Sequence, residues 1–329
     1  TQAAGWYDAT HVATIQEGND NAFNGDTVYV WDGTYTENVD IDKKVTIIGN
    51  GTTKTIIDGG DGGNVLIVTS DWVNISNCCI QNSGNAGFDA GIYIETSYIN
   101  ISYNNITSNR YGIYAPPAVT NTNLTIYNNT LVANTIYGIE ILSFIDSTIS
   151  YNTHISDVYG GIVAFDVYNV SIYNNTANDL TDFAGADGIA IGNSGNIGYP
   201  NMFTLYNNSC SGNAVYGILI YITDADSYFE NCNIYNNIVS DNGDAGMFIE
   251  QLRNSSISNC TINGNNGVGI YLDSGDNTSI SNCVVYENDK EGLYIEAIDN
   301  LTISNCTIFR NNGDGIAASV YIDDCETVM

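Results

Sequence analysis

The sequence predicts an all-β fold, a single parallel β-solenoid of about 12–13 coils, and three observations lead to it. A four-residue phrase, one apolar residue, two polar or Tyr residues and then Asn or Cys, recurs roughly every 23 residues. A second phrase, Gly-apolar-any-apolar, recurs in step with it from Gly91 to Gly315. Between the phrases, Asn, Gly and Asp separate short segments of alternating polarity. Such segments indicate β-strands bounded by turns rather than helices.

Each repeat unit is too short to hold a strand and a crossover helix, but it can hold three strands and three turns. Stacking such coils pairs every strand in parallel with its copies, at about 4.8 Å per coil. The Gly of the second phrase suits a positive φ or a place with no room for a side chain. The apolar residues after it are expected to point inward as Ile92/Ile94, Ile139/Ile141, Ile189/Ile191, Ile218/Ile220, Ile270/Leu272 and Leu293/Ile295.

The last residue of the first phrase is expected to form a vertical ladder inside the turns. An inward Asn amide can bond its copies above and below, as stacked amides do in cross-β structures, and a buried thiol can replace it. The predicted ladder consists of Cys78, Asn104, Asn129, Asn152, Asn175, Asn208, Cys232, Cys260, Cys283, Cys306 and Cys325.

The charge balance excludes several classes of function. The 329 residues include 7 Lys+Arg and 37 Asp+Glu, so the formal net charge is −30. A binder of nucleic acid or of an anionic membrane needs the opposite sign. No run of about 18 to 20 apolar residues predicts a membrane span. The start, Thr1-Gln2-Ala3, fits a chain whose signal peptide has been removed, and we expect an extracellular or cell-surface location.

The repeat, together with the segment from Thr14 to Gly49, resembles the right-handed parallel β-helix of pectate-lyase-like and NosD-like proteins. The resemblance implies a right-handed solenoid with a short N-terminal capping helix. Residues 1–25 then form the cap and residues 26–329 one continuous β-helix domain. It does not specify a function, because this fold serves lyases, hydrolases, adhesins and surface-layer proteins.

A row of carboxylates is the main candidate for chemistry. The residues expected to point outward on successive coils are Phe248/Glu250, Tyr271/Asp273 and Tyr294/Glu296, with Tyr93/Glu95 nearer the N-terminus. Like charges about 4.8 Å apart need a cation, a raised pKa or full solvation. Glu250, Asp273 and Glu296 therefore fit a site for Ca²⁺ or another divalent cation, a carboxylate pair for glycoside hydrolysis, or a solvated acidic edge.

Other signals of catalysis are weak, and no catalytic residue is predicted. The resemblance to polygalacturonases would require Asp-Asp, Gly-His-Gly and Arg-Ile-Lys, which are absent. The two His residues are His11 and His154, and the candidate pectate-lyase-like bases Arg110, Arg253 and Arg310 occur singly. The NosD-like resemblance implies a copper-related role, but no cluster of Met or His accompanies the cysteines. We therefore expect a protein that is not an enzyme.

Cysteines and sequons indicate an oxidising exterior. Cys79 follows a ladder residue and should point outward, where it could form a disulfide with another chain, whereas Cys210 should lie in the core. Fourteen Asn-x-Ser/Thr sequons occur. The five predicted to lie at turns, where a glycan would fit, are Asn74, Asn100, Asn169, Asn277 and Asn300.

Together these features resemble the archaeal surface-layer and sheath proteins that use this repeat. The sequence thus predicts a structural protein that assembles with itself into a layer, sheath or filament. Solenoid edges, the outward Tyr/Phe face, and interchain cysteine or cation contacts would hold it together. The alternatives are a carbohydrate-active β-helix enzyme, a polysaccharide lyase or glycoside hydrolase, and an adhesin that binds surface glycans.

Overall fold

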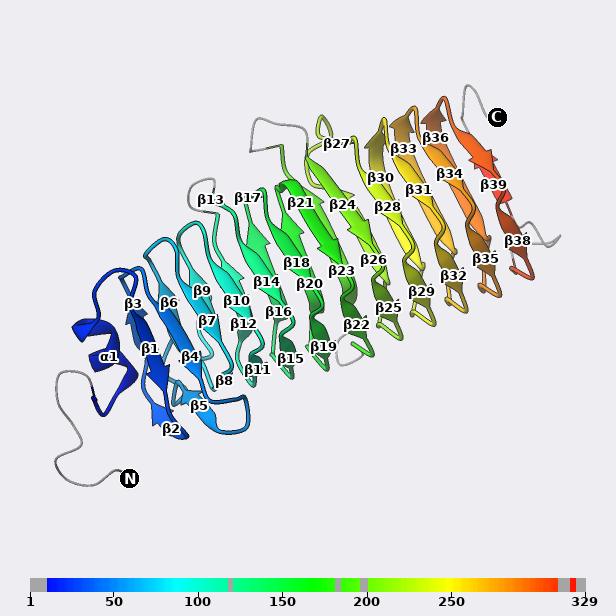
Figure 1. The fold of residues 1–329 in the computed structure, drawn as a ribbon. Coiled ribbons are helices and arrows are strands. Elements are labelled where there is room, and N and C mark those ends of the chain that lie inside the picture. Colours follow the sequence, from blue (N-terminus) through cyan, green and yellow to red (C-terminus); the bar gives the residue numbers. More distant parts are fainter. Residues whose placement is uncertain (1–10, 118–120, 181–184, 196–200, 313–319, 324–329) are drawn as a thin grey trace.

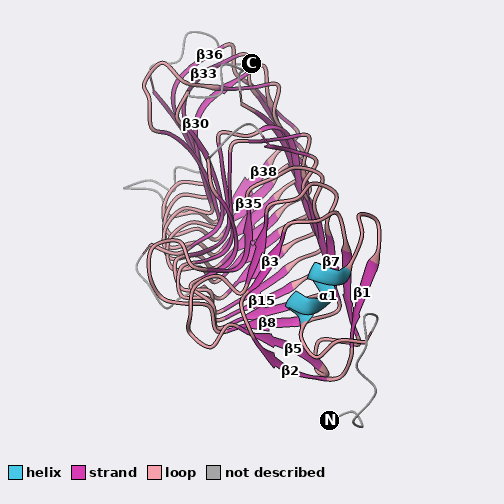
Figure 2. Ribbon diagram, turned by 90° about the vertical axis from the view of Figure 1, so that its left-hand side faces the viewer, coloured by secondary structure: helices cyan, strands magenta, loops and turns pink. Residues whose placement is uncertain are grey.

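The chain winds into a rod of stacked coils, and each coil gives one strand to each of three parallel sheets (Figure 1). The computed structural model describes residues 11–117, 121–180, 185–195, 201–312 and 320–323. The predicted right-handed parallel β-solenoid is confirmed, with about 12 coils. The helix α1 (Ile15–Asn21) precedes the first coil, and Ile15 is buried with the core that the coils enclose (Figure 2).

Sheet 1 has 14 strands, and each coil enters it first. Its strands are β1 (Thr27–Val30), β4 (Thr46–Gly49), β7 (Asn74–Ser76), β10 (Asn100–Ser102), β13 (Asn121–Thr122), β14 (Thr125–Tyr127), β17 (Phe144–Ile145), β18 (Thr148–Ser150), β21 (Tyr168–Tyr173), β24 (Met202–Tyr206), β28 (Asn233–Tyr235), β31 (Ser256–Ser258), β34 (Ser279–Ser281) and β37 (Thr302–Ser304).

Sheet 2 has 12 strands and follows sheet 1 after a sharp turn. Its strands are β2 (Gly33–Thr36), β5 (Thr55–Asp58), β8 (Cys79–Gln81), β11 (Asn105–Thr107), β15 (Thr130–Val132), β19 (Thr153–Ile155), β22 (Thr176–Asn178), β25 (Ser209–Ser211), β29 (Ile238–Ser240), β32 (Thr261–Asn263), β35 (Val284–Tyr286) and β38 (Thr307–Phe309).

Sheet 3 has 13 strands and carries the longest of them. Its strands are β3 (Val39–Ile41), β6 (Leu66–Val68), β9 (Ala90–Ile94), β12 (Tyr111–Ala115), β16 (Tyr137–Leu142), β20 (Gly160–Phe165), β23 (Asp187–Asn193), β26 (Ile218–Ile222), β27 (Phe229–Glu230), β30 (Met247–Arg253), β33 (Ile270–Asp276), β36 (Leu293–Asp299) and β39 (Val320–Asp323).

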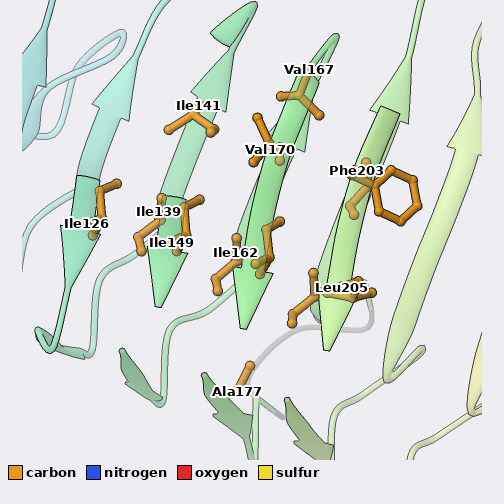
Figure 3. Close-up of a cluster of buried hydrophobic side chains, with 14 of the residues drawn as sticks. Ile126, Ile139, Ile141, Ile149, Ile162, Val167, Val170, Ala177, Phe203 and Leu205 are labelled. Atoms are coloured by element: carbon orange, nitrogen blue, oxygen red, sulfur yellow. The ribbon is translucent and has the colours of Figure 1, made fainter. Parts of the chain in front are cut away.

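Apolar columns fill the interior because equivalent residues of successive coils stand in register. Ile126 pairs with Ile149, and Ile149 with Ile172, while on sheet 3 Ile139 pairs with Ile162. These side chains are at most 1% exposed. Figure 3 shows four of them, Ile126, Ile139, Ile149 and Ile162, on the inner side of their strands. One coil alone buries little apolar surface, so the coils stabilise one another by stacking.

The recurring Gly of sheet 3 is required by lack of room. A Cβ on Gly246 would lie 2.8 Å from the carbonyl oxygen of Gly269 on the next coil and 2.7 Å from Nδ2 of Asn265. That distance is shorter than a real Cβ contact, so no larger residue fits without a shift. The Asn belongs to a second ladder, at the turn before sheet 3, that the sequence reasoning missed. Its described members are Asn109, Asn134, Asp157, Asn213, Asn242, Asn265, Asn288 and Asn311.

Candidate active site

Aromatic side chains cover two separate stretches of the outer face of sheet 3. In the first stretch, the rings of Phe88 and Tyr114 are stacked 5.0 Å apart, and Tyr111 lies 4.9 Å from Tyr114. The ring of Tyr137 lies 6.2 Å from that of Tyr111 and 6.4 Å from that of Tyr159 on the next coil. We call Phe88, Tyr111, Tyr114 and Tyr137 the first aromatic block.

The second aromatic block consists of Tyr216, Phe248, Tyr271 and Tyr294. The ring of Phe248 lies 5.4 Å from Tyr216 and stacks on Tyr271 at 4.8 Å, and Tyr271 stacks on Tyr294 at 4.9 Å. The block includes the three outward aromatic residues that the repeat predicted. Their rings stack because their strands are paired in register.

Small residues separate the two blocks. Along one row Gly160 stands between Tyr137 and Asp187, and along the next Val163 stands between Glu140 and Ala190. These small residues are nevertheless covered, because Val163 is only 7% exposed and a Cβ on Gly160 would lie 3.3 Å from the ring of Tyr137. Neighbouring side chains therefore fill this place between the blocks.

Two carboxyl groups border this place, and burial raises the pKa of both. The pKa of Glu140 is raised to about 7, because its charged form loses hydration. Burial also raises the pKa of Asp187 to about 7, although the backbone N–H of Tyr216 donates to its Oδ1 at 3.0 Å and favours the charged form. Both groups are therefore close to half-protonated at neutral pH.

Tyrosine hydroxyl groups lie near both carboxyls. Burial raises the pKa of Tyr137 to about 12, and the charges of Glu140 and Asp187 add to this. The pKa of Tyr221 is raised first by burial and then by the same two charges. Glu140 also raises the pKa of Tyr114 after the larger effect of burial. The two carboxyls thus share one environment with phenol groups, an arrangement that can give and accept protons near neutral pH.

The sequence reasoning did not single out Glu140 or Asp187. Glu140 is the second residue after the recurring Gly138, which is the same outward position as Tyr93 and Phe248. Most coils carry an apolar or aromatic residue at this position, so the carboxylate of Glu140 could have been recognised from the sequence as a candidate site residue. Asp187 directly precedes Gly188, at a position not considered.

The predicted carboxylate row forms, but as separate hydrogen-bonded groups. Strand register places Glu250 beside Asp273 and Asp273 beside Glu296. Glu250 accepts the backbone N–H of Ile222 at 2.9 Å, and Glu296 accepts the hydroxyl of Tyr271 at 2.9 Å. Throughout the described ranges, no three His, Cys, Asp or Glu side chains lie together as a metal site requires. The Ca²⁺ site therefore stays a prediction that rests on register alone.

The structure places most of the proposed ladder in one column and corrects one rung. Cys78 N–H donates to Oδ1 of Asn104, and each following Asn bonds the next, up to Asn208. The next rung is Asn237, whose Oδ1 accepts from Asn208 at 3.0 Å. Cys232 lies one turn earlier in the coil, where its N–H donates to the hydroxyl of Ser255. The sequence analysis placed Cys232 in the ladder because Phe229-Glu230-Asn231-Cys232 has the same pattern as the repeated phrase.

Cysteine rungs continue the column beyond Asn237. Register stacks Cys260, Cys283 and Cys306 on three consecutive coils, while Cys325 lies outside the described residues. Their thiols donate to turn carbonyls, as in the 3.3 Å contact of Cys260 with Ser258. A thiol thus takes over part of the role of the amide.

The prediction of an accessible Cys79 is wrong. Its side chain lies on the outer side of sheet 2, yet it is only 5% exposed, because Gln81 and Asn105 cover it. Burial raises the pKa of its thiol. All cysteines in the described ranges are free, and Cys210 is fully buried in the core.

His154 lies inside the solenoid rather than at a surface turn. It occupies an inward position of β19, is 1% exposed, and its Nδ1 lies 3.2 Å from Oδ2 of the buried Asp157. It cannot meet a substrate at the surface. His11 is exposed, and it lies among the residues that line a hollow beside α1.

The sequons fall into two groups. Asn277 and Asn300 are exposed at turns, both with a φ of 52°. Asn169 is also exposed, with a φ of 53°, but it lies at an irregularity within β21, so its placement at a turn was wrong. Asn74 and Asn100 instead begin strands β7 and β10 and are only partly exposed, so their placement at turns was wrong. Whether any of them carries a glycan stays a prediction.

Two family models match the chain side by side. Residues 19–178 match "Periplasmic copper-binding protein (NosD)", and residues 187–327 match "Right handed beta helix region". No curated protein sequence matches the chain. No helix in the described part of the chain has the length and apolar character of a membrane span.

Solved structures with the same fold include polysaccharide enzymes. The mannuronan C-5 epimerase AlgE6 A-module of Azotobacter vinelandii superposes with a TM-score of 0.62 at 14% identity, covering 95% of this chain and 93% of that one. The catalytic domain of a GH87 α-1,3-glucanase in complex with nigerose gives 0.59 at 12%, covering 94% and 65%. The Dettilon tailspike protein gives 0.62 at 13%, covering 90% and 61%.

These likenesses overturn the expectation that the chain is not an enzyme. The similar structures include epimerases of mannuronan and alginate and a glucanase, so the fold of this chain is one that polysaccharide enzymes use. Identities of 12–16% carry the fold and not the residues, so the site must be argued from this chain.

Copper does not fit the residues of the NosD-like part. Within residues 19–178 the soft or imidazole donors are Cys78, Cys79 and His154, and no Met occurs there. All three are buried, and His154 and the cysteines are on different coils. Copper sites use several thiolate, thioether or imidazole ligands around one point, which these residues do not supply.

Proposed function

We propose that this chain, a right-handed parallel β-helix protein with a NosD-like N-terminal half, is a glycoside hydrolase that acts on a neutral polysaccharide. The observation that carries the proposal is that Glu140 and Asp187, two carboxyls with pKa values raised to about 7, stand two coils apart on sheet 3 between the two aromatic blocks. Glycoside hydrolysis needs such a pair, one protonated and one ionised.

The environment of each carboxyl indicates its role. Burial alone raises the pKa of Glu140, which suits the acid that protonates the leaving oxygen. Asp187 accepts the N–H of Tyr216, which favours its ionised form and suits a base or nucleophile. The bond to be cleaved would lie beside these two carboxyls, next to the Tyr137 ring that covers Gly160.

The aromatic blocks supply binding on both sides of the carboxyls. Large, rigid, amphipathic rings can pack against the apolar faces of sugars while their hydroxyls hydrogen-bond. The first block ends on the coil of Glu140 and the second begins on the coil after Asp187, so a chain bound across both would run along the solenoid axis. The outward Tyr/Phe face, expected to join subunits, thereby gains a role in substrate binding.

A neutral substrate is favoured over an acidic one. The chain carries a formal net charge of −30. At the site, Arg110 is the cation beside the first block, 5.9 Å from the ring of Tyr111. A polyuronate would meet Glu140 and Asp187 with the same sign of charge, which costs binding energy. We therefore expect a substrate that is neutral, like an α-1,3-glucan, rather than acidic, like mannuronan.

A location outside the cytoplasm fits this activity. The matched NosD model is described as periplasmic, and a polysaccharide substrate is found in the periplasm or outside the cell. Self-association and contact with surface glycans remain proposals, and neither is needed for hydrolysis.

The test is release of reducing ends from a panel of neutral and acidic polysaccharides. We expect product from a neutral glucan, and a loss of about 10²-fold or more in Glu140→Gln and in Asp187→Asn. Glu250 lies on the same face but apart from Glu140 and Asp187, so the activity of Glu250→Gln should stay within about threefold of the wild-type activity. Equal activity of all four proteins would refute the assignment, and binding without product would indicate an adhesin.

A further inference from the structure

A second row of aromatic residues runs along the end of sheet 1, on a face other than that of Glu140 and Asp187. The tyrosine row consists of Tyr103, Tyr127, Tyr151, Tyr173, Tyr206 and Tyr235. It has one ring on each of six consecutive coils, and the centroids of neighbouring rings are 4.6–5.8 Å apart. It is continuous along the middle of the rod.

The fold does not require this row. Tyr235 pairs in register with Ser258, and the two following coils carry Ser281 and Ser304 at the same position. On the coil before the row the position holds Ser76. Two coils of the row also hold Ser at this position, Ser102 and Ser150, and carry their Tyr one residue later. Four of the six tyrosines thus occupy a position that Ser fills on other coils, so packing of the coil does not require them.

Two of the rings are turned relative to the others. Tyr173, Tyr206 and Tyr235 stack nearly parallel, at 9° and 6°, so their planes lie across the solenoid axis. Tyr151 stands at 79° to Tyr173, so its plane follows the axis. Tyr151 and Tyr103 are 46% and 47% exposed, and their coils lie two apart, at about 9.6 Å.

The surroundings of the row are uncharged. In these six coils the strands of sheets 1 and 2, from β10 to β29, contain no Asp, Glu, Lys or Arg. Thr, Ser and Asn flank the rings instead, as in β15 and β22. On a chain with 37 acidic residues, a neutral face rich in hydroxyls and amides suits an uncharged, polar partner with apolar faces.

We propose that the tyrosine row binds a neutral polysaccharide along the solenoid axis, and that this surface is separate from the one that carries Glu140 and Asp187. Tyr103 and Tyr151 offer half-exposed rings for stacking, and the other hydroxyls and the Asn side chains offer hydrogen bonds. The row holds the protein on an insoluble polymer. This binding does not require hydrolysis, so it stands whether or not Glu140 and Asp187 are catalytic.

The chain offers its own matched substitutions. Tyr103 and Tyr151 occupy turn positions with φ of 58°, where Asn stands on other coils, as at Asn128 with φ of 53°. Asn adopts this conformation readily, so Tyr103→Asn/Tyr151→Asn should fold. Tyr173→Ser/Tyr206→Ser copies the serines of the later coils and provides the second variant.

The experiment is sedimentation with insoluble α-1,3-glucan and with cellulose, using the wild type, both variants and Glu140→Gln. We expect each row variant to bind at least about tenfold more weakly than the wild type, and the same loss when the row changes are combined with Glu140→Gln, which removes hydrolysis. Trp72→Asn, which removes a 52% exposed ring elsewhere, should leave binding unchanged.

Three results would overturn the proposal. The first is that the row variants bind both glucans as the wild type does, and the second is that the wild type binds neither glucan. The third is a change from dimer to monomer in analytical ultracentrifugation of the row variants with glucan binding intact, which would make the row a contact between copies.

Discussion

Tyr137 and Asp187 stand in the same row of sheet 3, two coils apart, with only Gly160 between them. The gap matters because the charge of Asp187, together with that of Glu140, acts on the Tyr137 hydroxyl. The ring of Tyr137 lies over Gly160, so Tyr137, Glu140 and Asp187 share one partly buried environment on this face.

The first prediction concerns the Tyr137 hydroxyl. Tyr137→Phe keeps the ring of the first aromatic block but removes the group that shares its surroundings with both carboxyls. We expect kcat on a neutral glucan to fall by about tenfold or more while KM changes little. Tyr235→Phe, on the other face, is the control. A Tyr137→Phe enzyme with unchanged kcat would remove this hydroxyl from the site.

The second prediction is a pH-dependent gain in stability. Folding raises the pKa of the Glu140 carboxyl from about 4.3 in the unfolded chain to about 7. The folded state therefore loses stability relative to the unfolded state as the pH rises through this window. Glu140→Gln removes that cost. Relative to the wild type, its free energy of unfolding should therefore rise by about 2 kcal/mol between pH 4.5 and pH 8.

Urea unfolding at the two pH values measures this difference. Asp289→Asn, at an exposed carboxyl, is the matched control and should show a much smaller change. A difference for Glu140→Gln that stays the same at both pH values would mean that Glu140 is not buried in the way described.

The third prediction concerns the Asn ladder. The Asn152 side chain accepts from N and Nδ2 of Asn129 and donates to Asn175 and to the carbonyl of Ile126. Asn152→Ala leaves several buried groups without partners and should cost about 2–4 kcal/mol. Asn152→Cys should cost less, since the later coils use Cys there. Denaturant unfolding that ranks the two variants equally would contradict this.

The fourth prediction concerns thiol reactivity. Of the cysteines in the described ranges, Cys306 is the most exposed, while Cys79 and Cys210 are buried. In a Cys325→Ser background, iodoacetamide should label Cys306 first and Cys210 last, by mass spectrometry of the native protein. Rapid labelling of Cys79 would restore the idea of an interchain disulfide.

The buried pair His154 and Asp157 gives a fifth prediction. Asp157 accepts from Asn134 through Oδ1 and contacts His154 through Oδ2. Asp157→Ala should cost about 3–5 kcal/mol, because it leaves buried polar groups unpaired. Asp157→Asn, which matches the other rungs of that ladder, should cost less. Equal melting temperatures for all three proteins would count against this pairing.

The repeat made the fold predictable, because each phrase places an apolar residue such as Ile126 or Ile149 inward at a constant step. The candidate catalytic residues could not be predicted in the same way. The raised pKa values of Glu140 and Asp187 depend on burial by side chains from neighbouring coils, which spacing alone does not reveal. Cys79 shows the same limit, since its outward direction follows from alternation but its cover comes from Asn105 on the next coil.

The most direct test of the site is a ¹³C NMR titration of the carboxyl carbons of Glu140 and Asp187, assigned with Glu140→Gln and Asp187→Asn. It requires no knowledge of the substrate. Both groups should titrate near pH 7. Titration of both near pH 4, the ordinary range of carboxyl groups, would contradict the account.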